Sequence, residues 1–163
     1  MKKYSVQDHH ALADWAADCA ERVLNFFEEA CPGDDRPRRA IETCRAWART
    51  GVFRMTEIRG ASLAAHAAAR SAKENKAACF AARAAGQAVA TAHVPQHAYG
   101  AAYYALKTID SANRDSVEAK VIIERKWQAR RLPANLRKEV MGRIAVVNRK
   151  KGLFISVEKD ADF

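Results

Sequence analysis

The sequence predicts an all-α fold, a single-domain bundle of six or seven helices, on three observations. Apolar residues recur at spacings of three and four along most of the chain, as on helices with one buried face. Residues 61–105 contain 20 alanines among 45 positions, and alanine is the best helix former. The only strand-like run, residues 152–157, has no second run with which to pair. We therefore expect helices throughout and a short irregular C-terminal tail.

The alanine-rich region 61–105 predicts the close-packed centre of the bundle. Alanine side chains let two helix axes approach more closely than leucine does, and they lose no rotamer entropy on folding. Polar side chains buried on such faces must be satisfied by one another, by water or by a ligand. We expect such a network here. The polar residues set into this region are His66, Arg70, Arg83, Thr91, His93, His97 and Tyr104.

The N-terminal part predicts two helices. The first begins at a capping-box-like Ser5–Asp8 sequence, carries one apolar stripe as far as Ala30 and ends at residues 31–33. The second begins at residues 34–37, with an acidic cap and a proline in its first turn, and Gly51 ends it. Its buried stripe consists of Ile41, Cys44 and Trp47 or Ala48.

Five further helices are expected. The third spans about 56–73, the fourth 74–93 and the fifth 95–111, because Pro95 stops or kinks the chain. The sixth begins at residues 115–116 and ends at Leu132–Pro133, and the seventh spans 134–148. The apolar stripes of these last two are Val117, Ile123 and Trp127, and Leu136, Val140, Ile144 and Val147. We therefore divide the chain into a helical domain, residues 1–151, and a tail, residues 152–163.

Length and composition restrict the class of protein. A chain of 163 residues predicts one domain that buries about two-thirds of the surface that its unfolded form exposes. No apolar run reaches the roughly 20 residues that span a bilayer, and the N-terminus lacks the apolar core of a secretory signal. The four cysteines are scattered without a CxxC pair, which favours a reducing environment over a disulfide framework. We expect a cytoplasmic protein.

The net charge of +9 is concentrated in one segment. Residues 1–119 carry 16 Lys/Arg against 14 Asp/Glu, whereas residues 120–151 carry 11 against 2 and residues 152–163 carry 1 against 3. A basic segment attracts nucleic acid, anionic lipid or an acidic protein, and it can equally be a solvated helix face without a partner. The predicted basic patch consists of Arg130, Arg131, Arg137, Lys138, Arg143, Arg149, Lys150 and Lys151.

As a nucleic-acid site, this segment offers phosphate contacts but no means of reading a base sequence. Its two helices meet at Leu132–Pro133 without the glycine turn that is typical of a helix-turn-helix. Trp127 is its only aromatic residue, and the spacing from Ile123 predicts a place for Trp127 in the core. Non-specific binding of phosphate backbone is therefore one alternative function.

Three histidines are the candidate metal ligands. His93 and His97 are four residues apart, a spacing that can place two imidazoles on one helix face, and His66 could join them in space. Pro95 interrupts the helical turn that this pair needs, and no HExxH glutamate accompanies it. We therefore favour histidines that are hydrogen-bonded between close-packed helices and predict no cofactor. A metal or small-ligand site is the second alternative.

Carboxylates are also placed on one helix face. Asp14 and Asp18 are four residues apart and Glu21 follows, an arrangement that suits a divalent cation or an arginine cluster. The arginines of residues 36–39 are available, so we predict internal ion pairs. The complete predicted polar network is Asp18, Arg22, Asp35, Arg36, Arg38, His66, Arg70, His93 and His97.

No enzyme motif is evident in the sequence. It contains no GxSxG nucleophile motif and no glycine-rich phosphate loop, since its seven glycines are dispersed. We therefore predict no catalytic residues, and a binding protein rather than an enzyme.

Four blocks of the sequence, residues 9–50, 63–70, 81–106 and 124–140, resemble one bacterial family in the same order. The family is that of the Imm-5-like putative immunity proteins of polymorphic toxin systems. The motif residues that carry the resemblance are Trp15, Asp18, Cys19, Arg22, Asp35, Arg36, Pro37, Arg38, Trp47, His66, Arg70, Gly86, His93, His97, Trp127, Leu132 and Pro133. The tail from Gly152 onward lies outside the resemblance.

The resemblance implies a small cytoplasmic α-helical protein that neutralises a polymorphic toxin by binding it. Immunity proteins that block basic nuclease toxins tend to be acidic, whereas this chain is basic. The resemblance therefore implies either an acidic target surface or a contact through the near-neutral N-terminal part. A nucleic-acid-associated protein and a metal- or ligand-binding helical protein remain the alternatives. The toxin, the binding face and the oligomeric state stay open.

Overall fold

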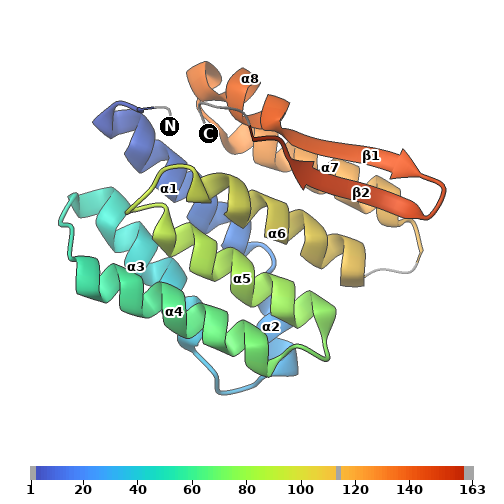
Figure 1. Ribbon diagram of the computed structural model, residues 1–163, viewed down its shortest axis with the longest axis horizontal. Coiled ribbons are helices and arrows are strands. Elements are labelled where there is room, and N and C mark those ends of the chain that lie inside the picture. Colours follow the sequence, from blue (N-terminus) through green and yellow to red (C-terminus); the bar gives the residue numbers. More distant parts are fainter. Residues whose placement is uncertain (1–2, 113–114, 160–163) are drawn as a thin grey trace.

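The computed structural model of the protein, which describes residues 3–112 and 115–159, is a helical bundle with one β-hairpin (Figure 1). Its elements over these residues are α1 (Val6–Glu21), α2 (Leu24–Ala30), α3 (Arg36–Thr50), α4 (Met55–Ser71), α5 (Lys76–Ala90), α6 (His97–Ala112), α7 (Val117–Arg131), α8 (Ala134–Arg143), β1 (Ile144–Arg149) and β2 (Gly152–Val157). The predicted all-α class is confirmed, since the two strands form only a small sheet near the C-terminus.

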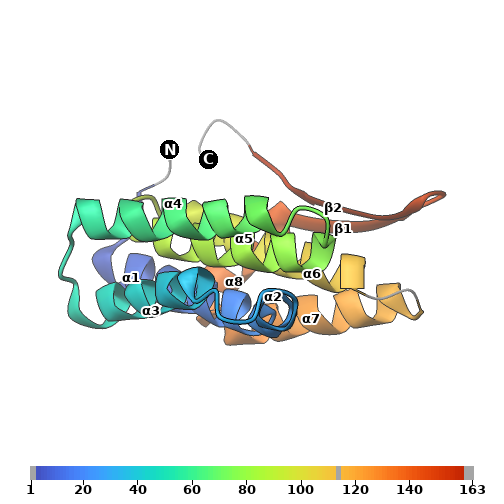
Figure 2. The ribbon, with the colours of Figure 1, turned by 90° about the horizontal axis from the view of Figure 1, so that it is seen from below.

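The helices form two layers, which are seen edge-on in Figure 2. One layer contains α4, α5 and α6, and the hairpin continues it because β2 packs beside α6. The other contains α1, α2, α3 and α7. Figure 1 looks onto the face of the first layer that points away from the second. This face, here called the outer face, is not covered by another described element.

Helix α5 lies at the centre of the bundle, in contact with α1, α2, α3, α4 and α6. Seven of its fifteen residues are alanines that are buried, together with Cys79, Gly86 and Val89. Because a methyl group is the largest side chain on most of its circumference, neighbouring helices approach it from several directions. The alanine-rich region thus occupies the position in the core that its composition predicts.

The prediction of one helix from Ser5 to Ala30 was wrong, because the chain bends at Val23. The backbone there leaves the helical region (φ −114°, ψ 1°), and Val23 N–H donates to Ala20 O at 3.2 Å in a tighter turn. The bend turns α2 towards α5 and buries Leu24 and Phe27 against the bundle. A straight helix would carry these two side chains beyond α5.

The prediction for residues 144–157 was also wrong, because the seventh helix ends at Arg143 and the chain continues as a hairpin. The run 152–157, which we expected to be an unpaired tail, pairs with β1 in antiparallel register from Ile144 opposite Val157 to Arg149 opposite Gly152. Ile144 and Ile155 are buried on the face that packs on the helices. The β-branched residues of 144–147 favour a strand once a second strand and a helical surface are available to pack against.

The inward face of α7 also differs from the prediction. Ile123, which we placed in the core, is 60% exposed, whereas Val121, Glu124 and Gln128 are buried. Gln128 is held between two other helices: its side-chain Nε2 donates to Ala102 O at 3.2 Å, and its backbone carbonyl accepts from Trp15 Nε1 at 2.9 Å. Polar contacts with α1 and α6 therefore decide the orientation of α7, and the apolar spacing misled the prediction.

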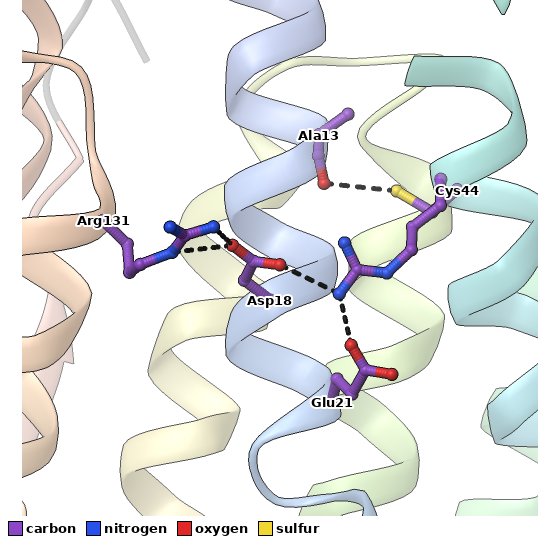
Figure 3. Close-up of polar contacts among 6 residues, drawn as sticks. Ala13, Asp18, Glu21, Cys44 and Arg131 are labelled. Carbon is purple, nitrogen blue, oxygen red and sulfur yellow. Dashed lines mark hydrogen bonds and ion pairs between the residues drawn. The ribbon is translucent and has the colours of Figure 1, made fainter. Parts of the chain in front are cut away.

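An ion cluster around Asp18 joins α1 to α3 and to the end of α7 (Figure 3). Asp18 accepts from Arg45 Nη2 at 2.9 Å with one oxygen and from Arg131 Nε at 2.9 Å with the other, and Arg45 also contacts Glu21. The expected partners from residues 36–39 are not used. In the same region, Cys44 Sγ lies 3.0 Å from Ala88 O and 3.4 Å from Ala13 O. Burial raises the pKa of this thiol, so it stays protonated as a donor.

No helix in the described part of the chain combines the length and the apolar character that are needed to cross a membrane.

Replacing Asp18 by asparagine tests the ion cluster. The side chain is only 14% exposed and is contacted by two arginines, so Asp18→Asn should lower the free energy of unfolding by about 1–3 kcal/mol in urea titrations. Asp14→Asn is the matched control, because Asp14 lies one turn earlier, is exposed and forms no ion pair with a described residue. Equal effects of the two substitutions would show that the cluster contributes nothing.

Candidate functional site

A hollow of about 350 Å³, here called the histidine hollow, opens on the outer face beside α4 and α5. Its walls come from α4, from α5, from the turn after α5 and from the start of α6. It is lined by Met55, Ile58, Arg59, Ser62, Leu63, His66, Gln87, Ala90, His93 and His97. The three histidines that the sequence singled out therefore lie around one cavity, although they belong to three different segments.

The ring of His66 packs directly on the backbone of Gly86. A Cβ atom at position 86 would lie 2.9 Å from His66 Nε2 and 3.0 Å from Cε1, closer than real contacts allow. A glycine inside a helix costs about 1 kcal/mol relative to alanine, so its presence in α5 needs a local reason. Room for the His66 ring is that reason.

The side chain of Gln87 packs on a glycine of α6 in the same way. A Cβ at Gly100 of α6 would lie 2.7 Å from Gln87 Oε1, so the glutamine side chain also lies flat on a glycine. His97 Nδ1 is 2.7 Å from the same oxygen. Since an amide oxygen only accepts, the Nδ1–H of His97 must donate, which leaves its Nε2 as an acceptor.

The environment keeps both histidines neutral near pH 7. Burial lowers the pKa of His66, and the nearby charges of Arg83 and Arg70 lower it further. Burial also lowers the pKa of His97, with smaller effects from His93 and Lys159. The imidazoles of His66 and His97 are therefore uncharged groups in a mainly apolar hollow, whose lining also includes the cation Arg59.

The residues of the predicted polar network lie in separate regions of the structure. His66, His93 and His97 line the hollow, but His93 is exposed rather than internal, and so is Arg70 in the last turn of α4. Asp18 belongs to the ion cluster on the opposite layer.

The arginines of the N-terminal half pair with acids other than those that the sequence suggested. Arg22 donates from Nε to both oxygens of the buried Glu124, at 2.9 and 3.1 Å, and lies 4.1 Å over the Trp127 ring. Arg38 pairs with Glu28 at 2.6 Å. At the start of α3, the carboxylate that binds Arg36 is that of Asp34, while Asp35 occupies the N-cap without a side-chain hydrogen bond.

Several cations of the predicted basic patch make contacts within the chain. Arg131 pairs with Asp18, and Arg137 donates to Ala129 O at 2.7 Å and to Leu132 O at 3.0 Å at the end of α7. Arg149 lies 3.7 Å over the Phe154 ring. All members of the patch are exposed except Arg143, which is half-buried.

Large apolar side chains are exposed next to the histidine hollow. Met55 and Leu63 line it and are 44% and 58% exposed, and Val52 and Phe53 precede them in the connection from α3 to α4. We call Val52, Phe53, Met55 and Leu63 the apolar rim.

Sequence reasoning missed Gln87 and Glu124. Gln87 follows Gly86, and a glycine inside an alanine-rich helix was a signal of close approach by another group. Glu124 is one of only two acids in residues 120–151, which was a signal of a specific partner. Among residues 3–112 and 115–159, no group of three or more His, Cys, Asp or Glu side chains is arranged to hold a metal ion.

Fold and site together define a small helical protein with a hollow on one open face, lined by histidines, Gln87 and apolar side chains. Comparison with known families identifies the family of the chain. The chain belongs to the Imm-5-like putative immunity protein family, whose model matches residues 2–135. This match covers α1 to α7 and ends within the first turn of α8, so the hairpin lies outside it. No curated protein and no solved structure matches the chain.

The close approach of His66 can be tested with two glycine substitutions. Gly86→Ala places a methyl group against the imidazole, so we expect the free energy of unfolding to fall by about 1–3 kcal/mol. Gly60→Ala, inside α4 with no atom near its new Cβ, should instead raise it by about 0.5–1 kcal/mol. Chemical unfolding of both variants measures the difference. Stabilisation of similar size in both would contradict the packing described here.

Acid should destabilise the protein through its half-buried histidines. The pKa values of His9, His66 and His97 are lowered in the folded state, so the unfolded chain, with values near 6.5, takes up protons first as the pH falls. The free energy of unfolding should therefore decrease between about pH 7.5 and pH 5.5. NMR titration of the ring protons supplies the direct check: a His66 or His97 ring that titrates above pH 6.5 would contradict the assignment.

Proposed function

We propose that this protein is an immunity protein that neutralises a cognate bacterial toxin by protein–protein contact, without catalysis. Membership of the Imm-5-like family supports the class of function. The mode of action is supported by the apolar rim, whose four side chains are between 44% and 58% exposed and of which Met55 and Leu63 line the histidine hollow. Exposed apolar groups that gather in one place beside a hollow mark sites of protein contact.

Covering the apolar rim with a partner stabilises the complex. Burial of apolar surface contributes about 25 cal/mol per Å², and an aromatic residue such as Phe53 or a long side chain such as Met55 supplies a large part of that area. The histidine hollow next to the rim provides space for a protruding side chain of the partner. Its polar groups, Gln87 and the imidazoles, can then bind that side chain.

The charge of this face favours an acidic partner. Arg54 and Arg59 are exposed beside the rim, and Glu57 is the one acid between them. No Asp or Glu is among the residues that line the hollow. A toxin with an acidic surface would thus meet complementary charge, which raises the rate of association and makes that rate depend on salt. This agrees with the overall charge of +9.

Products of the genes adjacent to its own are the candidates for the toxin. Each is expressed alone and together with this protein, and growth is followed. We expect one product to arrest growth alone, to be harmless in the presence of this protein and to co-purify with it as a stoichiometric complex. If no adjacent product is both toxic and bound, the proposal is wrong.

A matched pair of charge substitutions tests the binding face. Leu63→Glu places a carboxylate on the apolar rim and should weaken toxin binding by about 30-fold or more, which corresponds to about 2 kcal/mol, and should abolish protection of growth. Ile123→Glu on α7 is the control, since Ile123 is equally exposed but lies on the other layer. Binding is measured by calorimetry and folding by thermal melts. Equal losses, or a loss only with Ile123→Glu, would place the interface elsewhere.

A further inference from the structure

The outer edge of β2 carries a row of backbone hydrogen-bonding groups that point away from β1. Glu158 N–H donates to Arg143 O at 2.8 Å, so this pair is a hydrogen-bonded one. Hydrogen-bonded pairs alternate along an antiparallel ladder, which makes the next ones 145/156, 147/154 and 149/152. The N–H and C=O groups of Leu153, Ile155 and Val157 therefore face outward.

The rest of the protein contacts the two edges of the hairpin differently. On β1, Arg125 of α7 donates to Ile144 O at 3.1 and 3.2 Å and to Met141 O at 2.8 Å, which occupies the start of that edge. On β2, no hydrogen bond within the described ranges, 3–112 and 115–159, uses the outward groups of residues 153, 155 and 157. Such an edge is a template for a further strand.

A second hollow, of about 660 Å³, lies between this edge and α6, and we call it the strand hollow. Residues 154–157 form one wall, and Tyr99, Gly100, Tyr103 and Tyr104 of α6 form another. Gln87 and His97 line both this hollow and the histidine hollow, so the two adjoin on the outer face. The strand edge thus has space beside it and an aromatic surface to receive side chains.

The charges around this edge select an acidic occupant. Residues 149–157 contain three cations, Arg149, Lys150 and Lys151 at the turn of the hairpin, and no acid, while Glu158, Lys159, Asp160 and Asp162 follow β2 in the sequence. No Asp or Glu lines the strand hollow. Pairing with a second copy of the chain would bring two basic hairpins together, which like charges oppose. An acidic segment of another protein meets complementary charge instead.

We propose that the outer edge of β2 is a docking site for an extended, acidic segment of the toxin, which adds a third strand to the hairpin and fills the strand hollow. The outward groups repeat every second residue, about 6.8 Å apart, a spacing that an extended chain matches and a helix does not. The toxin as the source of the segment rests on the proposed function. From the apolar rim, such a toxin reaches the strand hollow across the histidine hollow, which adjoins both.

A peptide measures the strand site without the toxin. The probe is a capped hexapeptide of alternating Glu and Val, and the control is the same peptide with Lys in place of Glu. Amide hydrogen exchange of the full chain is followed by NMR. Saturating Glu peptide should slow exchange at Leu153, Ile155 and Val157 by about tenfold when its concentration is nine times Kd, since protection scales as 1 + [L]/Kd. The amides of residues 154 and 156 already bond to β1 and should be slow throughout.

Three results of this experiment would overturn the inference. No protection of the three amides at millimolar peptide would show that the edge of β2 does not bind a strand. Equal protection by the Lys peptide would show that the edge does not prefer an acidic segment. Protection of the same amides without peptide, rising with protein concentration together with dimer formation, would assign the edge to a second copy.

A proline at the edge distinguishes backbone pairing from side-chain contact. Leu153→Pro removes one outward N–H, whereas Leu153→Ala shortens the same side chain and keeps the N–H. We expect the proline variant to bind the Glu peptide, and the toxin once identified, at least tenfold more weakly than the alanine variant. Circular dichroism and NMR show whether the hairpin persists, and Val157→Pro with Val157→Ala repeats the comparison at the other end.

The outcomes separate the two proposals. Peptide binding without any toxin partner would contradict the proposed function but support the strand site. Toxin binding that is equal in the proline and alanine variants would contradict the strand site but remain consistent with the proposed function.

Discussion

Close packing around α5 is the constraint on which the rest of the structure depends. Five helices contact this one helix, and they can do so only because its buried side chains are mostly methyl groups. A larger residue at a position such as Ala81 or Ala85 would push a neighbouring helix outward and move every element that packs on it. The two layers, the orientation of α4 and α6, and the outer face between them all follow from this centre.

The same close packing creates the polar site. Where helices approach this closely, a side chain can lie between them only if the facing residue has no Cβ atom, and Gly86 and Gly100 meet this condition for His66 and Gln87. The imidazoles of His66 and His97 are thereby held half-buried at the edge of α5, with lowered pKa values. The two glycines inside helices are each unfavourable by themselves, and the polar side chains that pack on them explain their presence.

The outer face combines features that serve recognition of another protein. The apolar rim, the histidine hollow and the strand hollow follow one another across α4, α5, α6 and β2, and Gln87 and His97 join the two hollows. The opposite layer carries the ion cluster of Asp18 and the pair of Arg22 with Glu124, which hold α1, α3 and α7 together. The charges of that layer pair with one another, whereas Arg54 and Arg59 beside the apolar rim are exposed, with Glu57 as the acid between them.

The sequence by itself determined the helical class, the alanine-rich centre, the family resemblance and the histidines that surround the hollow. These depend on local propensity, periodicity and composition. Tertiary structure decided the bend at Val23, the inward face of α7, the ion-pair partners of Asp18 and the conversion of residues 144–149 into a strand. Each of these depends on a residue distant in sequence: Leu24 and Phe27 are buried against α5, Gln128 bonds to α6, and β1 exists because β2 pairs with it. The spacing of residues along one segment carries no information about which distant residue will pack on that segment or bond to it.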